Sequence, residues 1–141
     1  MSYKDLPQDW ESEPVRDPGR AADVLDLFVP DQMREQGAIY LLLCDQDDRL
    51  LQPCAVETVP EEGADVSRES FFAPFIEVLT RLTPAGAVLV ALARPEGLSL
   101  TSSDREWQAA ASAVCSAASV RLLGVHLLTL HGSRVLPPIV Q

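Results

Sequence analysis

Long apolar runs are absent from this sequence, and their absence excludes a membrane-spanning protein. No apolar run reaches the ~20 residues that a transmembrane helix needs. The first residues, 1–14, are polar and acidic, without the apolar core of a secretory signal. We therefore expect a cytoplasmic protein that makes no membrane contact.

Cysteine and histidine are too few and too scattered to form a metal site. The cysteines are Cys44, Cys54 and Cys115, none in a C-x-x-C pair and each in apolar or small-residue surroundings, so we expect buried, reduced thiols. The only histidines are His126 and His131. If one strand ran through both, their side chains would point to opposite faces. With no glycine-rich phosphate loop either, we expect no metal and no cofactor.

Acidic residues far outnumber basic residues in the first half of the chain. Residues 1–69 contain 17 of the 21 acidic residues, and the whole chain has a net charge of −10. An acidic half repels phosphate backbones, which argues against nucleic-acid binding. It favours a basic protein partner.

What is present is 47% hydrophobic residues, in patterns that alternate between helix and strand. Periodicity and turn signals predict helices at 20–28, 70–82 and 101–120, and strands at 38–44, 50–59, 87–93, 122–130 and 134–139. This order predicts a single α/β domain, residues 20–141, with a mixed sheet and flanking helices. An acidic, proline-containing tail at residues 1–19 precedes it, and the acidic stretch 57–69 is expected to be an exposed loop.

Prolines refine this prediction. Pro74 is tolerated only in a first helical turn, so the second helix should begin near Phe71 or Phe72. The apolar face expected for that helix consists of Phe71, Phe75, Val78, Leu79 and Leu82. Prolines also indicate that two strands lie at sheet edges, through Pro53 in strand 50–59 and through Pro137 and Pro138 in strand 134–139.

Residues 88–104, VLVALARPEGLSLTSSD, form the stretch most suggestive of a site. They read as a buried strand, a Pro/Gly loop and the capped start of an Ala-rich helix, an arrangement that often carries chemistry. Two capping boxes are possible, Thr101 with Asp104 or Ser103 with Glu106.

This stretch resembles the RadC-like branch of the JAB/MPN metalloproteases, a resemblance that covers roughly residues 20–139. Active members carry His-x-His-Pro-x-Gly, a spacer and Ser-x-x-Asp. Pro95, Gly97 and Asp104 match this pattern, and Thr101 stands at the serine position. The resemblance implies a JAB/MPN (cytidine-deaminase-like) architecture.

The same resemblance implies a lost metal site. In active members the two histidines and the aspartate hold zinc, and an upstream glutamate is the general acid/base. Here Leu92 and Arg94 stand at the histidine positions, and Glu57 is a weakly matched candidate for the glutamate. A catalytic zinc usually needs three protein ligands. We expect Arg94 to replace the metal by pairing with Asp104 or Glu96.

The resulting hypothesis is a metal-free, catalytically inactive module that acts through protein–protein contact, with a protein partner or a second copy pairing at an edge strand. Glu57, Thr101 and Asp104 would be relics of a catalytic site, or simply a solvent-facing strand residue and helix-start residues. One alternative is a metal-dependent hydrolase that uses Glu57 and Asp104. Another is a sensor of small anions whose ligand-binding residues are Arg94, Glu96 and Ser99.

Overall fold

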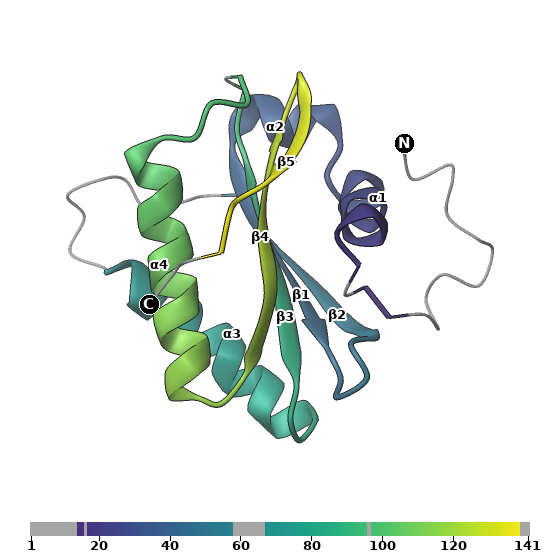
Figure 1. Cartoon of the computed structure of the whole chain (residues 1–141), viewed down its shortest axis with the longest axis vertical. Coiled ribbons are helices and arrows are strands. Elements are labelled where there is room, and N and C mark those ends of the chain that lie inside the picture. Colours follow the sequence, from purple (N-terminus) through teal and green to yellow (C-terminus); the bar gives the residue numbers. More distant parts are fainter. Residues whose placement is uncertain (1–13, 16, 58–66, 96, 139–141) are drawn as a thin grey trace.

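The computed structural model describes residues 14, 15, 17–57, 67–95 and 97–138. Within them a five-stranded sheet carries helices on both faces, in the predicted order of elements apart from one additional short helix, α2 (Figure 1). The elements are α1 (Pro18–Phe28), α2 (Asp31–Gln36), β1 (Ala38–Cys44), β2 (Leu50–Val56), α3 (Arg68–Leu82), β3 (Ala87–Ala93), α4 (Ser102–Ala117), β4 (Arg121–Thr129) and β5 (Gly132–Val135). The prediction of a single α/β domain with a mixed sheet is confirmed.

The sheet has the strand order β2-β1-β3-β4-β5. β1 is antiparallel to both β2 and β3, and β4 is antiparallel to β5. β3 and β4 are parallel, because α4 carries the chain back across the sheet between them. β2 and β5 are the two edges, as the prolines predicted.

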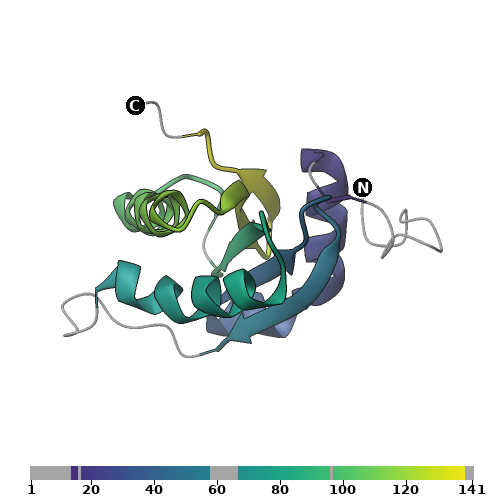
Figure 2. The same ribbon diagram turned by 90° about the horizontal axis from the view of Figure 1, so that it is seen from below.

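Two apolar layers lie on opposite faces of the sheet. Figure 2 shows α3 and α4 on one side and α1 on the other. Trp107 and Phe72 belong to the first layer, and Leu25 and Tyr40 belong to the second. All seven residues of β1 and all seven of β3 are buried, because both strands are covered on both faces.

The predicted start of α3 is wrong. The helix begins at Arg68, and Pro74 lies inside it. The Ser67 hydroxyl accepts a hydrogen bond from the Ser70 backbone N–H at 3.1 Å and caps the helix ahead of the proline.

The predicted apolar face of α3 is also partly wrong. Phe72, Ile76 and Leu79 are buried, whereas Val78 and Leu82 are 46% and 54% exposed. The buried residues are spaced i, i+4 and i+7, so the face of α3 that packs on the sheet is narrower than the set of apolar residues along the helix. Two large apolar side chains of α3 are therefore exposed.

Other boundaries shift by a few residues. Pro18 starts α1, earlier than predicted, because the Asp17 carboxylate accepts from the Arg20 backbone N–H at 3.0 Å. Val15 is buried, and its N–H donates to the Asp48 carbonyl. β5 ends at Val135, short of the predicted 134–139. The rest of the predicted tail, 1–13 and 16, and most of the acidic loop, 58–66, lie outside the described residues. No helix within the described ranges is both long and apolar enough to span a bilayer.

Candidate functional site at the β3–α4 loop

The candidate site is the loop that leaves the carboxyl end of β3. Leu92, at the first histidine position of the resemblance, is only 5% exposed and packs in the core layer beneath α3 and α4. Arg94 follows the strand, and its backbone N–H donates to the Leu128 carbonyl at 3.1 Å. The loop therefore starts alongside β4, and the positively charged Arg94 stands where the resemblance places a zinc-ligating histidine.

The Arg94 guanidinium joins three segments of the chain. Nη2 donates to Asp104 Oδ2 at 2.8 Å, and Nε donates to Asp104 Oδ1 at 3.3 Å. Nη1 donates to the Gly97 carbonyl at 3.1 Å, and Nη2 also donates to the Ser99 carbonyl at 2.8 Å. We call this arrangement the Arg94 clamp. It confirms the predicted pairing with Asp104, whereas Glu96 lies outside the described residues.

A capping box holds the other side of the clamp. The Asp104 backbone N–H donates to the Thr101 hydroxyl at 3.1 Å, and the Thr101 backbone N–H donates to Asp104 Oδ2 at 2.9 Å. Of the two possible boxes, Thr101 with Asp104 is the one that forms. Asp104 Oδ2 thus accepts from the helix start and from Arg94 together.

Asp104 remains ionised in this setting. Asp104 is 4% exposed, and burial alone would raise the pKa of its carboxyl group. The hydrogen bond from Arg94, the backbone hydrogen bond from Thr101 and the Arg94 charge outweigh burial and lower the pKa below its ordinary value of 3.8. The clamp is therefore a charge-assisted pair with little access to water.

A shallow cavity of about 390 Å³ lies over the clamp. Its lining residues are Arg94, Gly97, Ser99, Thr101, Ser103 and Asp104. The described residues contain no cluster of three His, Cys, Asp or Glu side chains that could hold a metal. Asp104 is the single carboxylate among the described residues of this lining, and a guanidinium lies against it, so these residues do not fit a zinc ion.

Glu57 and Asp104 are not brought together. Glu57 is exposed and directly follows the edge strand β2, with β1 between β2 and β3. Burial raises the pKa of Tyr40, and the charge of Glu57 raises it further. Tyr40 belongs to the apolar layer under α1, whereas Asp104 begins a helix on the opposite face. The two carboxylates therefore do not form an acid/base pair across one cavity.

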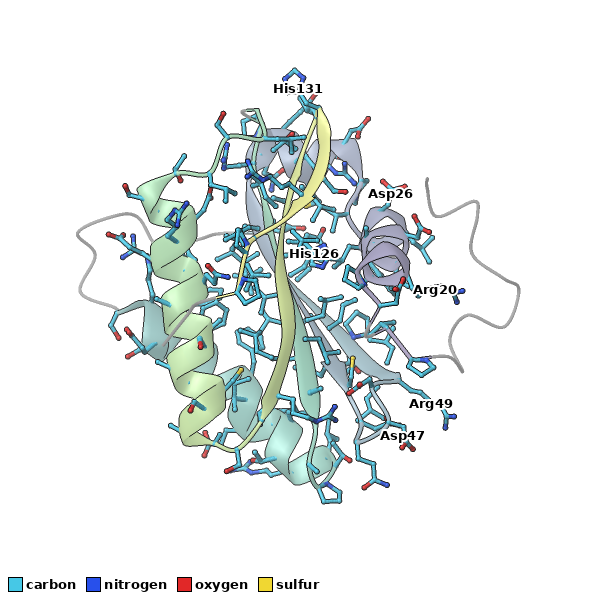
Figure 3. The ribbon with its side chains drawn as sticks, in the orientation of Figure 1. Arg20, Asp26, Asp47, Arg49, His126 and His131 are labelled. Atoms are coloured by element: carbon cyan, nitrogen blue, oxygen red, sulfur yellow. The ribbon has the colours of Figure 1, made fainter. Side chains whose placement is uncertain are left out.

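The histidines and cysteines are also separate from the loop. Figure 3 shows His126 between the sheet and α1, and His131 at the exposed β4–β5 turn. Burial lowers the pKa of His126 to about 4. Burial, the largest cause in each case, raises the pKa of Cys44 to about 12 and that of Cys115 to about 11. Neither thiol is a nucleophile near neutral pH. The expectation of buried, reduced thiols is confirmed for Cys44 and Cys115, whereas Cys54 is free but only partly buried, because it lies on the edge strand β2.

A second polar cluster escaped the sequence prediction. Asp23 and Arg34 are 7% and 6% exposed, on the α1 face of the sheet. Nothing in the sequence separates Asp23 from the other aspartates near it, because its burial depends on how α1 lies on the sheet.

Comparison of the chain with family models, with curated proteins and with solved structures finds no match. The roles of these residues therefore rest on the geometry of this chain.

Proposed function

We propose that this chain is a metal-free, catalytically inactive module of JAB/MPN architecture that acts by binding another protein. The observation that carries the proposal is the Arg94 guanidinium on the Asp104 carboxylate, at the position that the resemblance assigns to zinc. The helix and hairpin ahead of β3, and the strand and short hairpin after α4, follow the order that the resemblance implies. That order supports the architecture.

Direct competition with a metal argues for an inactive site. Both oxygens of Asp104 accept hydrogen bonds, Oδ1 from Arg94 and Oδ2 from Arg94 and Thr101. A cation could bind Asp104 only by displacing a guanidinium whose side chain is 18% exposed. An exposed Glu57 on the far side of β1 offers no general base there.

An apolar groove between α3 and α4 is the surface that we assign to the partner. Its volume is about 550 Å³. The lining residues are Glu69, Ala73, Ile76, Glu77 and Thr80 of α3, with Ala113, Val114, Ala117 and Ala118 at α4. Small residues along α4 let another backbone approach closely, which suits an amphipathic helix laid in a groove.

The charge at the rim selects a basic partner helix. Glu69 has no ion-pair partner among the described residues, and Glu77 meets only the exposed Arg81, at 3.5 Å. None of the described residues that line the groove is basic. Lys and Arg flanking an apolar stripe would therefore complement the groove.

A second copy fits less well. Two copies would each bring a net charge of −10. The edges that could pair are interrupted, β2 by Pro53 and the chain after β5 by Pro137 and Pro138, and such prolines block strand addition.

The test uses purified chain and two designed helical peptides of about 15 residues, one of Leu and Lys and one of Leu and Glu. Fluorescence anisotropy should show binding of the Leu/Lys peptide alone. Ala113→Arg, inside the groove, should weaken binding about tenfold or more. Ser116→Arg, exposed on the same helix outside the groove lining, is the matched control and should bind as wild type does.

Affinity capture from the native cell then uses the same variants to identify the partner. A physiological partner is a protein retained by wild type and Ser116→Arg but lost with Ala113→Arg. Equal binding of both peptides, or equal binding by both variants, would contradict the groove. One tightly bound zinc per purified chain, with peptidase activity lost in Asp104→Asn, would contradict the whole proposal.

A sensor of small anions finds less support. The hydrogen-bond donors of Arg94 already serve Asp104, Gly97 and Ser99, so an anion would have to break the clamp to reach the guanidinium. Ser99 contributes its carbonyl, which repels anions.

A further inference from the structure

A small polar pocket lies on the other face of the sheet from the groove. Its volume is about 140 Å³. The lining residues are Ala22, Asp23 and Asp26 of α1, Arg34 of α2, and Leu128, Gly132 and Ser133 of the β4–β5 hairpin. Three separate parts of the fold therefore meet around it.

Arg34 holds these parts together. Nε donates to the Val29 carbonyl and Nη1 to the Thr129 carbonyl, both at 3.1 Å, and Nη2 donates to Asp26 Oδ1 at 2.9 Å. The Arg34 side chain is 8% exposed, whereas that of Asp26 is 33% exposed. Arg34 thus ties α1, α2 and the end of β4 into one wall.

Asp23 is the member of the pocket that this network leaves out. It is 7% exposed, and it has no hydrogen bond or ion pair with any described residue. Because Asp23 lines the pocket and no described residue pairs with it, its carboxylate oxygens can accept hydrogen bonds from a group bound there. A carboxylate in that position favours a cationic group.

The surrounding charge agrees with a cation. Among the described lining residues, Asp23, Asp26 and Arg34 carry a net charge of −1. His126 lies two residues before Leu128, so both side chains are on the same face of β4. Figure 3 shows that this face is turned toward α1. Burial lowers the pKa of His126 to about 4, so it adds no positive charge at neutral pH.

We propose that this pocket binds the ammonium or guanidinium head of an organic monocation. A divalent metal is disfavoured, because the Arg34 guanidinium forms part of the wall and no three-ligand cluster exists among the described residues. The pocket is smaller than those that enclose drug-sized molecules, so it accepts a head group and a short chain. Ala22 and Leu128 would contact the methylene groups, and Asp23 would accept the charge.

The test is an NMR titration of the full chain with n-butylammonium, with neutral n-butanol as the control ligand. The amides of residues 22–26, 132 and 133 should shift saturably with the cation alone. Asp23→Asn should weaken binding about tenfold or more, because a charge-assisted hydrogen bond is lost. Asp31→Asn, at an exposed aspartate outside the pocket, should bind as wild type does.

A second measurement separates a binding role from a structural one. Without ligand, the Tm of Asp23→Asn should equal or exceed that of wild type, because no described residue pairs with the Asp23 carboxylate. A tripeptide blocked at both ends, glycine-lysine-glycine, distinguishes the source of the cation. Competition by the peptide indicates a lysine of a partner protein, and binding of butylammonium alone indicates a free amine.

Three results would overturn the inference. One is the absence of saturable shifts with both cations. Another is equal affinity of wild type and Asp23→Asn. The third is a lower Tm of Asp23→Asn, which would assign Asp23 to the fold.

Discussion

Arg94 and Asp104 lie ten positions apart in the sequence and meet through two hydrogen bonds, Nη2–Oδ2 at 2.8 Å and Nε–Oδ1 at 3.3 Å. The pair joins the end of β3 to the first turn of α4. Its side chains are 18% and 5% exposed, so water screens it poorly. The relationship ties the end of β3 to the start of α4 and occupies both oxygens of the Asp104 carboxylate.

Removing Arg94 should destabilise the protein. Arg94→Ala leaves the buried Asp104 carboxylate without its charge partner, and we expect a loss of about 3 kcal/mol in the free energy of unfolding, measured by urea titration. The unfolding free energy of Arg94→Lys should lie between those of wild type and Arg94→Ala, because an ammonium group cannot reproduce the planar, two-pronged hydrogen bonding of a guanidinium. Arg81→Ala is the control, since its pair with Glu77 is exposed on both sides and should change stability little. An Arg94→Ala loss no larger than that of Arg81→Ala would contradict the clamp.

The Arg94 clamp should also make the stability of the protein depend on pH in the acid range. The folded pKa of Asp104 lies below its ordinary value of 3.8, so its stabilisation is complete above that value and is lost as pH falls through the lower, folded pKa. The difference in unfolding free energy between wild type and Asp104→Asn should therefore be largest near neutral pH and shrink below about pH 4. Urea titrations at stepped pH measure it. A difference that stays constant down to acid denaturation would show that the charge of Asp104 contributes nothing.

His126 should produce a separate, earlier loss of stability. Burial depresses its folded pKa from 6.5 to about 4, so the unfolded chain binds a proton in this window and the folded chain does not. Stability should fall by about 3 kcal/mol as pH drops across the window. His126→Leu should abolish this slope, measured by thermal unfolding in stepped buffers. His131→Leu, at the exposed turn, should keep the wild-type profile; a flat wild-type profile would contradict the buried neutral imidazole.

Pro74 offers a test of where α3 begins. With the helix starting at Arg68, Pro74 lies beyond the first turn and denies the helix one N–H donor. Pro74→Ala should stabilise the protein by about 1–3 kcal/mol, measured by urea titration. Were the helix to begin near Phe71, the substitution would change stability by less than about 0.5 kcal/mol.

Much of the fold could be predicted because local signals agreed with the tertiary structure. The apolar runs of β1 and β3, bounded by turn residues, predicted both strands to the residue. The start of α3 could not be predicted in the same way. Pro74 was the strongest local signal, but the Ser67 cap and the burial of Phe72 against the sheet outweigh it.

The features of the candidate site separate in the same way, into those that local sequence predicts and those that depend on the tertiary structure. The sequence by itself determined the buried strand, and it limited the cap to two possible boxes and the partner of Arg94 to Asp104 or Glu96, because these features depend on residues within one short stretch. The structure shows the Thr101–Asp104 box and the Arg94–Asp104 pair. Only the tertiary structure decided that Glu57 lies away from Asp104, and that Asp23 is buried and unpaired beside Arg34. These outcomes depend on which face of the sheet each segment covers, and strand order and helix placement decide that face through burial summed over the whole chain.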